Sequence, residues 1–96
     1  MKLEKIKKVC EEKSQILRER FRVRNLEIFG SYARREQKKG SDLDVLVEFE
    51  EPIDLITFIE LENYLSELLG IKVDLVAKSA LKSRIRDSIL KEAVHL

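Results

Sequence analysis

Two acidic residues one position apart carry the chemical interest of this sequence. Asp42 and Asp44 lead directly into the apolar run 45–47. Residues two apart in an extended segment point to the same side, so both carboxylates face one spot. Two like charges repel there unless a cation lies between them, and oxygen ligands without His or Cys suit Mg²⁺ or Mn²⁺. The pair therefore indicates a metal site. The alternative is that Asp42 caps a turn and Asp44 is solvated where a strand begins.

A third acid, Asp74, interrupts an otherwise apolar strand that the pattern predicts over residues 71–76. An acid is disfavoured in a core strand, and a buried unpaired charge is costly. If this strand lies beside the one that begins at Asp44, Asp74 joins the pair at one metal site. The alternative is an exposed strand face on which Asp74 pairs with Lys72.

A Gly-Ser turn, Gly30-Ser31, precedes the acids and follows a short predicted strand. Glycine lets the backbone approach a ligand closely, and the free N–H groups at a helix start attract phosphate. Basic residues come next and are able to neutralise triphosphate oxygens, although solvated loop charges are the default interpretation of each: Arg34, Arg35, Lys38 and Lys39. The segment 30–44 thus combines a phosphate cradle with a metal site, as the handling of a nucleoside triphosphate requires.

Helices and strands are expected to alternate around these residues. Apolar residues at helical spacing, capping residues and short apolar runs predict helices over 3–20, 31–35, 54–69 and from Ser79 onward, and strands over 26–29, 44–49 and 71–76. The expected fold class is α/β (α+β), with helices packed on a three-stranded mixed sheet. At 96 residues, the chain is expected to be a single domain, 1–96.

The helix predicted over 54–69 has both end signals, with Asp54 as its cap and Gly70 as its stop. Its apolar residues cover more than one narrow stripe. This pattern suggests a second buried surface, an interface with a partner, and the alternative is a thick core. Tyr32 and Tyr64 are expected to pack rather than to stack on a base.

Bulk composition excludes several function classes. The chain has 19 basic and 18 acidic side chains, so no overall field attracts nucleic acid, which argues against a nucleic-acid partner. It shows no signal-peptide pattern and no apolar run long enough to span a membrane. Its one cysteine, Cys10, is expected to be buried, and His95 to be a tail residue without a partner. A cytoplasmic location is the resulting expectation.

The chain resembles the polymerase-beta-type nucleotidyltransferase superfamily through Gly30-Ser31, ten intervening residues, Asp42-Leu43-Asp44 and a later strand acid, Asp74. Its short length, the segment 30–34 and the ending 86–93 are similar to the minimal nucleotidyltransferase (MNT) branch. The resemblance covers about Leu26 to Glu92. One departure is visible, because Arg35 stands where many relatives have glycine.

The resemblance implies a Mg²⁺-dependent nucleotidyltransferase with the polymerase-beta-like core. It assigns binding of the ATP phosphates to Gly30, Ser31 and Arg34. It assigns catalysis and the binding of two Mg²⁺ ions to Asp42, Asp44 and Asp74. Of two such ions, one activates the attacking hydroxyl and the other stabilises the departing pyrophosphate.

The resemblance also implies a partner. Many MNT proteins are encoded beside a small helical HEPN toxin and act as its antitoxin, which implies transfer of AMP from ATP to a HEPN tyrosine. A non-catalytic antitoxin that neutralises its partner by binding alone is the alternative. A small-molecule or RNA nucleotidyltransferase ranks last, since the 96 residues contain no further helical domain and the net charge is +1. Base preference, stoichiometry and oligomeric state stay open, a homo-oligomer included.

Overall fold

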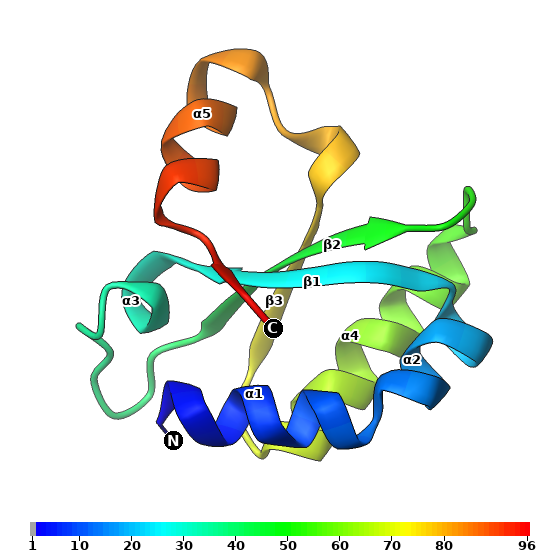
Figure 1. Cartoon of the computed structure of the whole chain (residues 1–96), viewed down its shortest axis with the longest axis horizontal. Coiled ribbons are helices and arrows are strands. Elements are labelled where there is room, and N and C mark those ends of the chain that lie inside the picture. Colours follow the sequence, from blue (N-terminus) through cyan, green and yellow to red (C-terminus); the bar gives the residue numbers. More distant parts are fainter. Residues whose placement is uncertain (1) are drawn as a thin grey trace.

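The structure is a computed structural model, and it describes residues 2–96 of the chain (Figure 1). The α-helices are α1 (Leu3–Glu12), α2 (Ser14–Phe21), α3 (Gly30–Ala33), α4 (Leu55–Leu69) and α5 (Ser83–Glu92). The strands are β1 (Val23–Phe29), β2 (Leu43–Phe49), β3 (Val73–Ala77) and β4 (Val94–His95), and a 3₁₀ turn, η1, covers Lys78–Ala80. Within residues 2–96, no helix is long and apolar enough to cross a membrane.

The sheet is mixed, with the strand order β3-β2-β1-β4. β2 is antiparallel to β1 and parallel to β3, whereas β4 is antiparallel to β1. The predicted class of helices on a mixed sheet is confirmed, but the expected count of three strands is wrong. The short edge strand β4 was missed because two residues carry no periodicity. His95 belongs to it and is no free tail residue, since its Nε2 lies 3.3 Å from Oδ1 of Asn25.

Two helix boundaries differ from the expectations. The helix predicted over 3–20 is two helices, which break at Lys13. Each of the two short helices buries its own apolar residues against the twisted sheet: Leu3, Ile6 and Cys10 in α1, and Leu17 and Phe21 in α2. The last helix begins at Ser83 rather than Ser79, because Leu81 and Lys82 are extended.

Both end signals of α4 are confirmed. Oδ1 of Asp54 accepts a 2.7 Å hydrogen bond from the backbone N–H of Thr57, and Gly70 closes the helix at φ 69°. This capped helix lies against β3 and also contacts α1 and α2. It therefore forms one layer with them.

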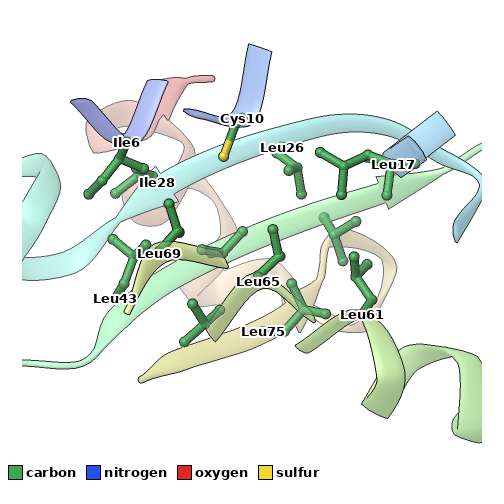
Figure 2. Packing of buried hydrophobic residues seen from close by; sticks show 14 of the residues in the cluster. Ile6, Cys10, Leu17, Leu26, Ile28, Leu43, Leu61, Leu65, Leu69 and Leu75 are labelled. Carbon is green, nitrogen blue, oxygen red and sulfur yellow. The ribbon is translucent and has the colours of Figure 1, made fainter. Parts of the chain in front are cut away.

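The hydrophobic core fills one face of the sheet, which we call the core face. Strand residues with inward-facing side chains pack there against α1, α2 and α4 (Figure 2): Leu26, Ile28, Leu43, Val45, Val47, Val73 and Leu75. Helical residues complete it, and Ile6, Phe21, Leu61 and Leu65 are almost fully buried. Cys10 is buried as expected, and burial raises the pKa of its thiol to about 11.

The opposite face of the sheet differs in kind. The alternation of side chains along β1, β2 and β3 places four acids on it: Glu27, Asp44, Glu48 and Asp74. We call this the acidic face. Figure 1 shows α5 on this side, away from α1 and α4. None of the side chains of α5 is fully buried, and the helix contacts mainly β1 and α3.

Candidate active site

Strand pairing brings two of the predicted acids together. β2 and β3 run parallel, and the register makes Asp74 the direct partner of Asp44. Both side chains lie on the acidic face, so two like charges stand side by side. Burial, followed by the charges of Asp74 and Asp42, raises the pKa of Asp44 above its ordinary value of 3.8. The fold thus holds the three carboxylates near enough to influence one another.

The third acid, Asp42, lies just before β2 and faces a lysine. Its Oδ2 is 3.9 Å from Nζ of Lys72, so Lys72 pairs with Asp42 rather than with Asp74. In this arrangement of side chains, no three His, Cys, Asp or Glu residues among 2–96 are grouped closely enough to hold a metal ion. The pair with Lys72 is exposed, and exposed pairs contribute little to stability. A rotation of the Asp42 side chain therefore costs little.

Gly30 packs directly against Asp44. It begins α3 with φ 72°, a backbone conformation that L side chains rarely adopt. A Cβ at this position would collide with Oδ2 of Asp44. Only glycine fits both the turn and the carboxylate behind it, so the predicted phosphate turn and the predicted metal site form one place. Ser31 follows in α3 and is half-buried.

A fourth carboxylate at this place was not identified from the sequence. The backbone N–H of Gly30 donates a 3.1 Å hydrogen bond to Oε1 of Glu92, at the end of α5. Nη1 of Arg34 donates to both oxygens of Glu92, at 3.3 and 3.1 Å. These donors lower the pKa of Glu92. The one available signal was that Glu92 lies in the ending 86–93 that resembles MNT proteins.

The two arginines after the turn have different surroundings. Arg34, predicted to bind phosphate, is held by Glu92 and also lies 3.5 Å from Oε2 of Glu36. Its positive charge partly offsets the rise in the pKa of Asp44. Arg35 adopts φ 57° and pairs with Glu4 at 2.8 Å. A left-handed conformation of this kind favours glycine over a residue with a side chain.

An open groove of about 540 Å³ adjoins Asp42. Three lysines line it: Lys38, Lys39 and Lys72. They give one side of the site a local positive charge in a chain whose net charge is only +1. Tyr32 also lines the groove and is buried, so its expected packing role is confirmed.

This arrangement is able to bind a polyanion together with a hard cation. Adjacent carboxylates without a neighbouring His or Cys suit Mg²⁺ or Mn²⁺. The donor set therefore fits such an ion once Asp42 turns from Lys72 towards the other two acids. A glycine turn and basic side chains next to the acids suit the phosphates that such an ion accompanies.

Comparisons with known proteins agree with this chemistry. The nucleotidyltransferase domain family matches residues 3–96. Protein adenylyltransferase MntA of Thermococcus cleftensis is 52% identical over 94 residues, which cover 98% of this chain and 95% of that protein. A Methanocaldococcus jannaschii protein with the provisional name protein adenylyltransferase is 46% identical over 95 residues, covering 98% and 97%.

Solved structures share the fold. One, provisionally described as a minimal nucleotidyltransferase, has a TM-score of 0.85 and 38% identity, and covers 100% of this chain and 97% of that chain. A toxin–antitoxin complex with AMP-PNP has a TM-score of 0.72 and 25% identity, and covers 88% and 70%. The resemblance to nucleotidyltransferases is therefore confirmed: the chain belongs to the nucleotidyltransferase domain family.

Proposed function

We propose that this protein is a Mg²⁺-dependent adenylyltransferase that transfers AMP from ATP to a hydroxyl group of a partner protein. The observation that carries the proposal is the register of β2 and β3, which pairs Asp44 with Asp74 behind the Gly30 turn. Identity of 52% with a protein adenylyltransferase supports the choice of AMP and of a protein acceptor. The requirement for ATP suggests the cytoplasm as the location.

Each part of the site has a proposed task. Gly30 and Ser31 hold the β- and γ-phosphates, and Arg34 adds positive charge beside them. Asp42, Asp44 and Asp74 would hold up to two Mg²⁺ ions, which would supply charge neutralisation for the attacking hydroxyl and for the departing pyrophosphate. Asp74 lies near the acceptor. The acceptor oxygen forms a bond to the α-phosphorus, the bond from that phosphorus to the pyrophosphate oxygen breaks so that pyrophosphate is released, and the hydroxyl proton passes to solvent water.

The acceptor that we propose is a tyrosine on a small helical HEPN-type toxin, as the family resemblance implies. A solved neighbour at 25% identity is a toxin–antitoxin complex that holds an ATP analogue. AMP on the toxin would then neutralise it, which makes this chain the antitoxin.

A second candidate is an antitoxin that neutralises its partner by binding alone. The first turn of α4 favours it, because Leu55 and Ile56 are 72% and 68% exposed there. Ile59, on the next turn, is 46% exposed. An apolar surface of this kind marks a contact with another protein. The two functions are compatible, since a modifying enzyme must first dock.

Incubation with ATP labelled at the α-phosphate, Mg²⁺ and the protein encoded next to this one tests the proposal. The wild-type protein should label its neighbour, whereas Asp42→Asn with Asp44→Asn should not. Asp87→Asn is the matched control, because Asp87 is an exposed acid on α5 that has no proposed role in the site. Equal labelling by the double variant contradicts the mechanism.

Neutralisation of the toxin in cells separates the two candidates. If binding alone suffices, the double Asn variant protects cells as well as the wild type does. If AMP transfer is required, the variant still binds the toxin but fails to protect. A co-purification assay on the same variants shows that binding is intact.

A further inference from the structure

Glu92 bridges the two ends of α3. Its carboxylate accepts from the backbone N–H of Gly30 at the first residue of that helix. It also accepts from the guanidinium of Arg34, the residue that closes the helix. One side chain from the end of the chain therefore ties together both ends of the segment that carries Ser31.

This segment depends on outside support. α3 has four residues, and a helical turn of that length is unfavourable alone, because several dihedral angles are fixed for few hydrogen bonds. The pairing of β1 with β4 covers only Glu27 and Ile28, so it stops short of Gly30. Glu92 accepts the hydrogen bond of the Gly30 N–H group that the sheet leaves unpaired.

Helix α5 depends on the same contact. None of its own side chains is fully buried, and Ile85, in its first turn, is 47% exposed. Figure 1 shows it standing apart from the helices that build the core. The Glu92 side chain is 30% exposed and makes hydrogen bonds at 3.1 to 3.3 Å to two residues of the site. The Glu92 carboxylate thus joins α5, which is otherwise loosely packed, to the Gly30–Ser31 turn.

Two carboxylates, those of Glu92 and Asp44, lie next to Gly30. Gly30 turns its N–H towards α5, while a Cβ on the same residue would point at Asp44. Glu92 and Asp44 therefore approach Gly30 from different directions.

We propose that Glu92 is a positioning residue, which holds the Gly30–Ser31 turn and the guanidinium of Arg34 in place before ATP binds. The inference rests on the proposed function, because the turn is assigned there to the ATP phosphates. Preformed geometry lowers the cost of ordering the turn when a ligand arrives. Removal of the carboxylate is therefore expected to loosen the turn and weaken nucleotide binding.

Two measurements on Glu92→Ala and Glu92→Gln test the proposal. Hydrogen exchange of the Gly30 amide, without any ligand, is expected to become about tenfold faster in Glu92→Ala. The Kd for ATP with Mg²⁺ is expected to rise by about fivefold in the same variant. Glu92→Gln keeps an acceptor oxygen for Gly30 but loses the charge that holds Arg34, so both of its values should fall between wild type and Glu92→Ala.

Glu50 provides the matched control. It accepts hydrogen bonds from Nε and Nη2 of Arg24 at 3.2 and 3.1 Å, an exposed pair on the far part of β1. Glu50→Ala and Glu50→Gln remove an equivalent contact and should change neither the exchange of Gly30 nor the affinity for ATP. All variants are compared at a temperature well below their unfolding transitions.

The outcomes separate this proposal from the proposed function. Unchanged exchange and unchanged Kd in Glu92→Ala overturn the positioning role, even if AMP transfer is intact. Tighter ATP binding by Glu92→Ala also overturns it, because Glu92 would then compete with phosphate. A wild-type protein that binds no ATP overturns both proposals, whereas one that binds ATP but transfers no AMP overturns only the proposed function.

Discussion

The two faces of the sheet differ in what holds them. On the core face, α1, α2 and α4 bury apolar side chains against the strands, with Phe21, Leu61 and Leu65 at 0–1% exposure. On the acidic face, Leu46 is buried, but no side chain of α5 itself is, and the contact of α5 with the site is a carboxylate on a backbone turn. The same strands therefore carry stability on one side and candidate chemistry on the other.

Because of this difference, we expect stability and AMP transfer to respond separately to mutation. Core residues act through transfer and packing energy, which does not depend on ligands. Clustered carboxylates reduce stability through mutual repulsion and are retained at a cost, as is common at functional sites. Variants on each face should move one property and leave the other largely unchanged.

Leu65→Ala on the core face should have the largest effect on stability. It leaves a cavity between α4 and the sheet, so the free energy of unfolding should fall by about 2–5 kcal/mol. Chemical denaturation measures this loss. ATP binding at a low temperature, where the variant stays folded, should match the wild type; a large loss of affinity there would break the separation of the faces.

Gly30→Ala tests the turn that packs on the acidic face. The new Cβ adopts a left-handed conformation and collides with Asp44, so stability should fall by about 1–3 kcal/mol and AMP transfer should be lost. Gly70→Ala is the control, because Gly70 has a similar φ of 69° but open space around its Cα. It should lose similar backbone energy while it keeps transfer activity. Equal activity of both variants would contradict the close packing of the turn on the acid.

Asp44→Asn should stabilise the protein while it inactivates the site. Because the pKa of Asp44 is raised, the ionised carboxylate costs free energy at neutral pH, and the wild type loses stability as pH rises from 3.8 through the folded-state pKa. Asp44 is partly exposed, so the gain in Tm at pH 7 should be small, about 2 °C.

The pH dependence of that gain is its control. Below pH 3.8 the carboxyl group is protonated in both states, so the Tm values of Asp44→Asn and wild type should converge. Mg²⁺ should raise the Tm of the wild type more than that of the variant. If the Tm of Asp44→Asn is lower than that of the wild type at neutral pH, Asp44 stabilises the fold instead.

Arg35→Gly should have the smallest effect. Relief of the left-handed conformation favours glycine, whereas the more flexible unfolded chain and the lost ion pair with Glu4 oppose it, so the net change should stay below about 1 kcal/mol. Arg22→Gly is a matched comparison, since Arg22 has φ 58° and an exposed pair with Glu51. Weaker ATP binding in Arg35→Gly alone would give Arg35 a role in the site.

The sequence was informative where local pattern determines structure. The caps of α4, the buried Cys10 and the glycine turn follow from residue type and spacing, because each depends on neighbours in the chain. The sequence could bring Asp44 and Asp74 together only under the assumption that their two strands are neighbours. The structure shows that they are, with Asp44 opposite Asp74. A layered α/β domain was predictable because helices separate its strands, but this alternation favours parallel pairing and gives no signal for the antiparallel pair of β1 and β2.

Other features had no local signal. Glu92 reaches Gly30 from 62 positions away along the chain, and a two-residue strand such as β4 has no periodicity to detect. The turn of Asp42 towards Lys72 depends on side-chain rotation, which spacing does not determine. Long-range polar contacts thus account for most of what the sequence left out.

Asp74→Asn is the most direct test of the central claim that the acidic face forms one transfer site. Asp74 joins the other acids only through the pairing of β3 with β2. The measurement is the rate at which label from the α-phosphate of ATP appears on the partner protein, with Mg²⁺ and with Tm recorded for the same sample. We expect the rate to fall by about 100-fold or more while Tm is unchanged or higher. A variant that transfers AMP at the wild-type rate would contradict the account.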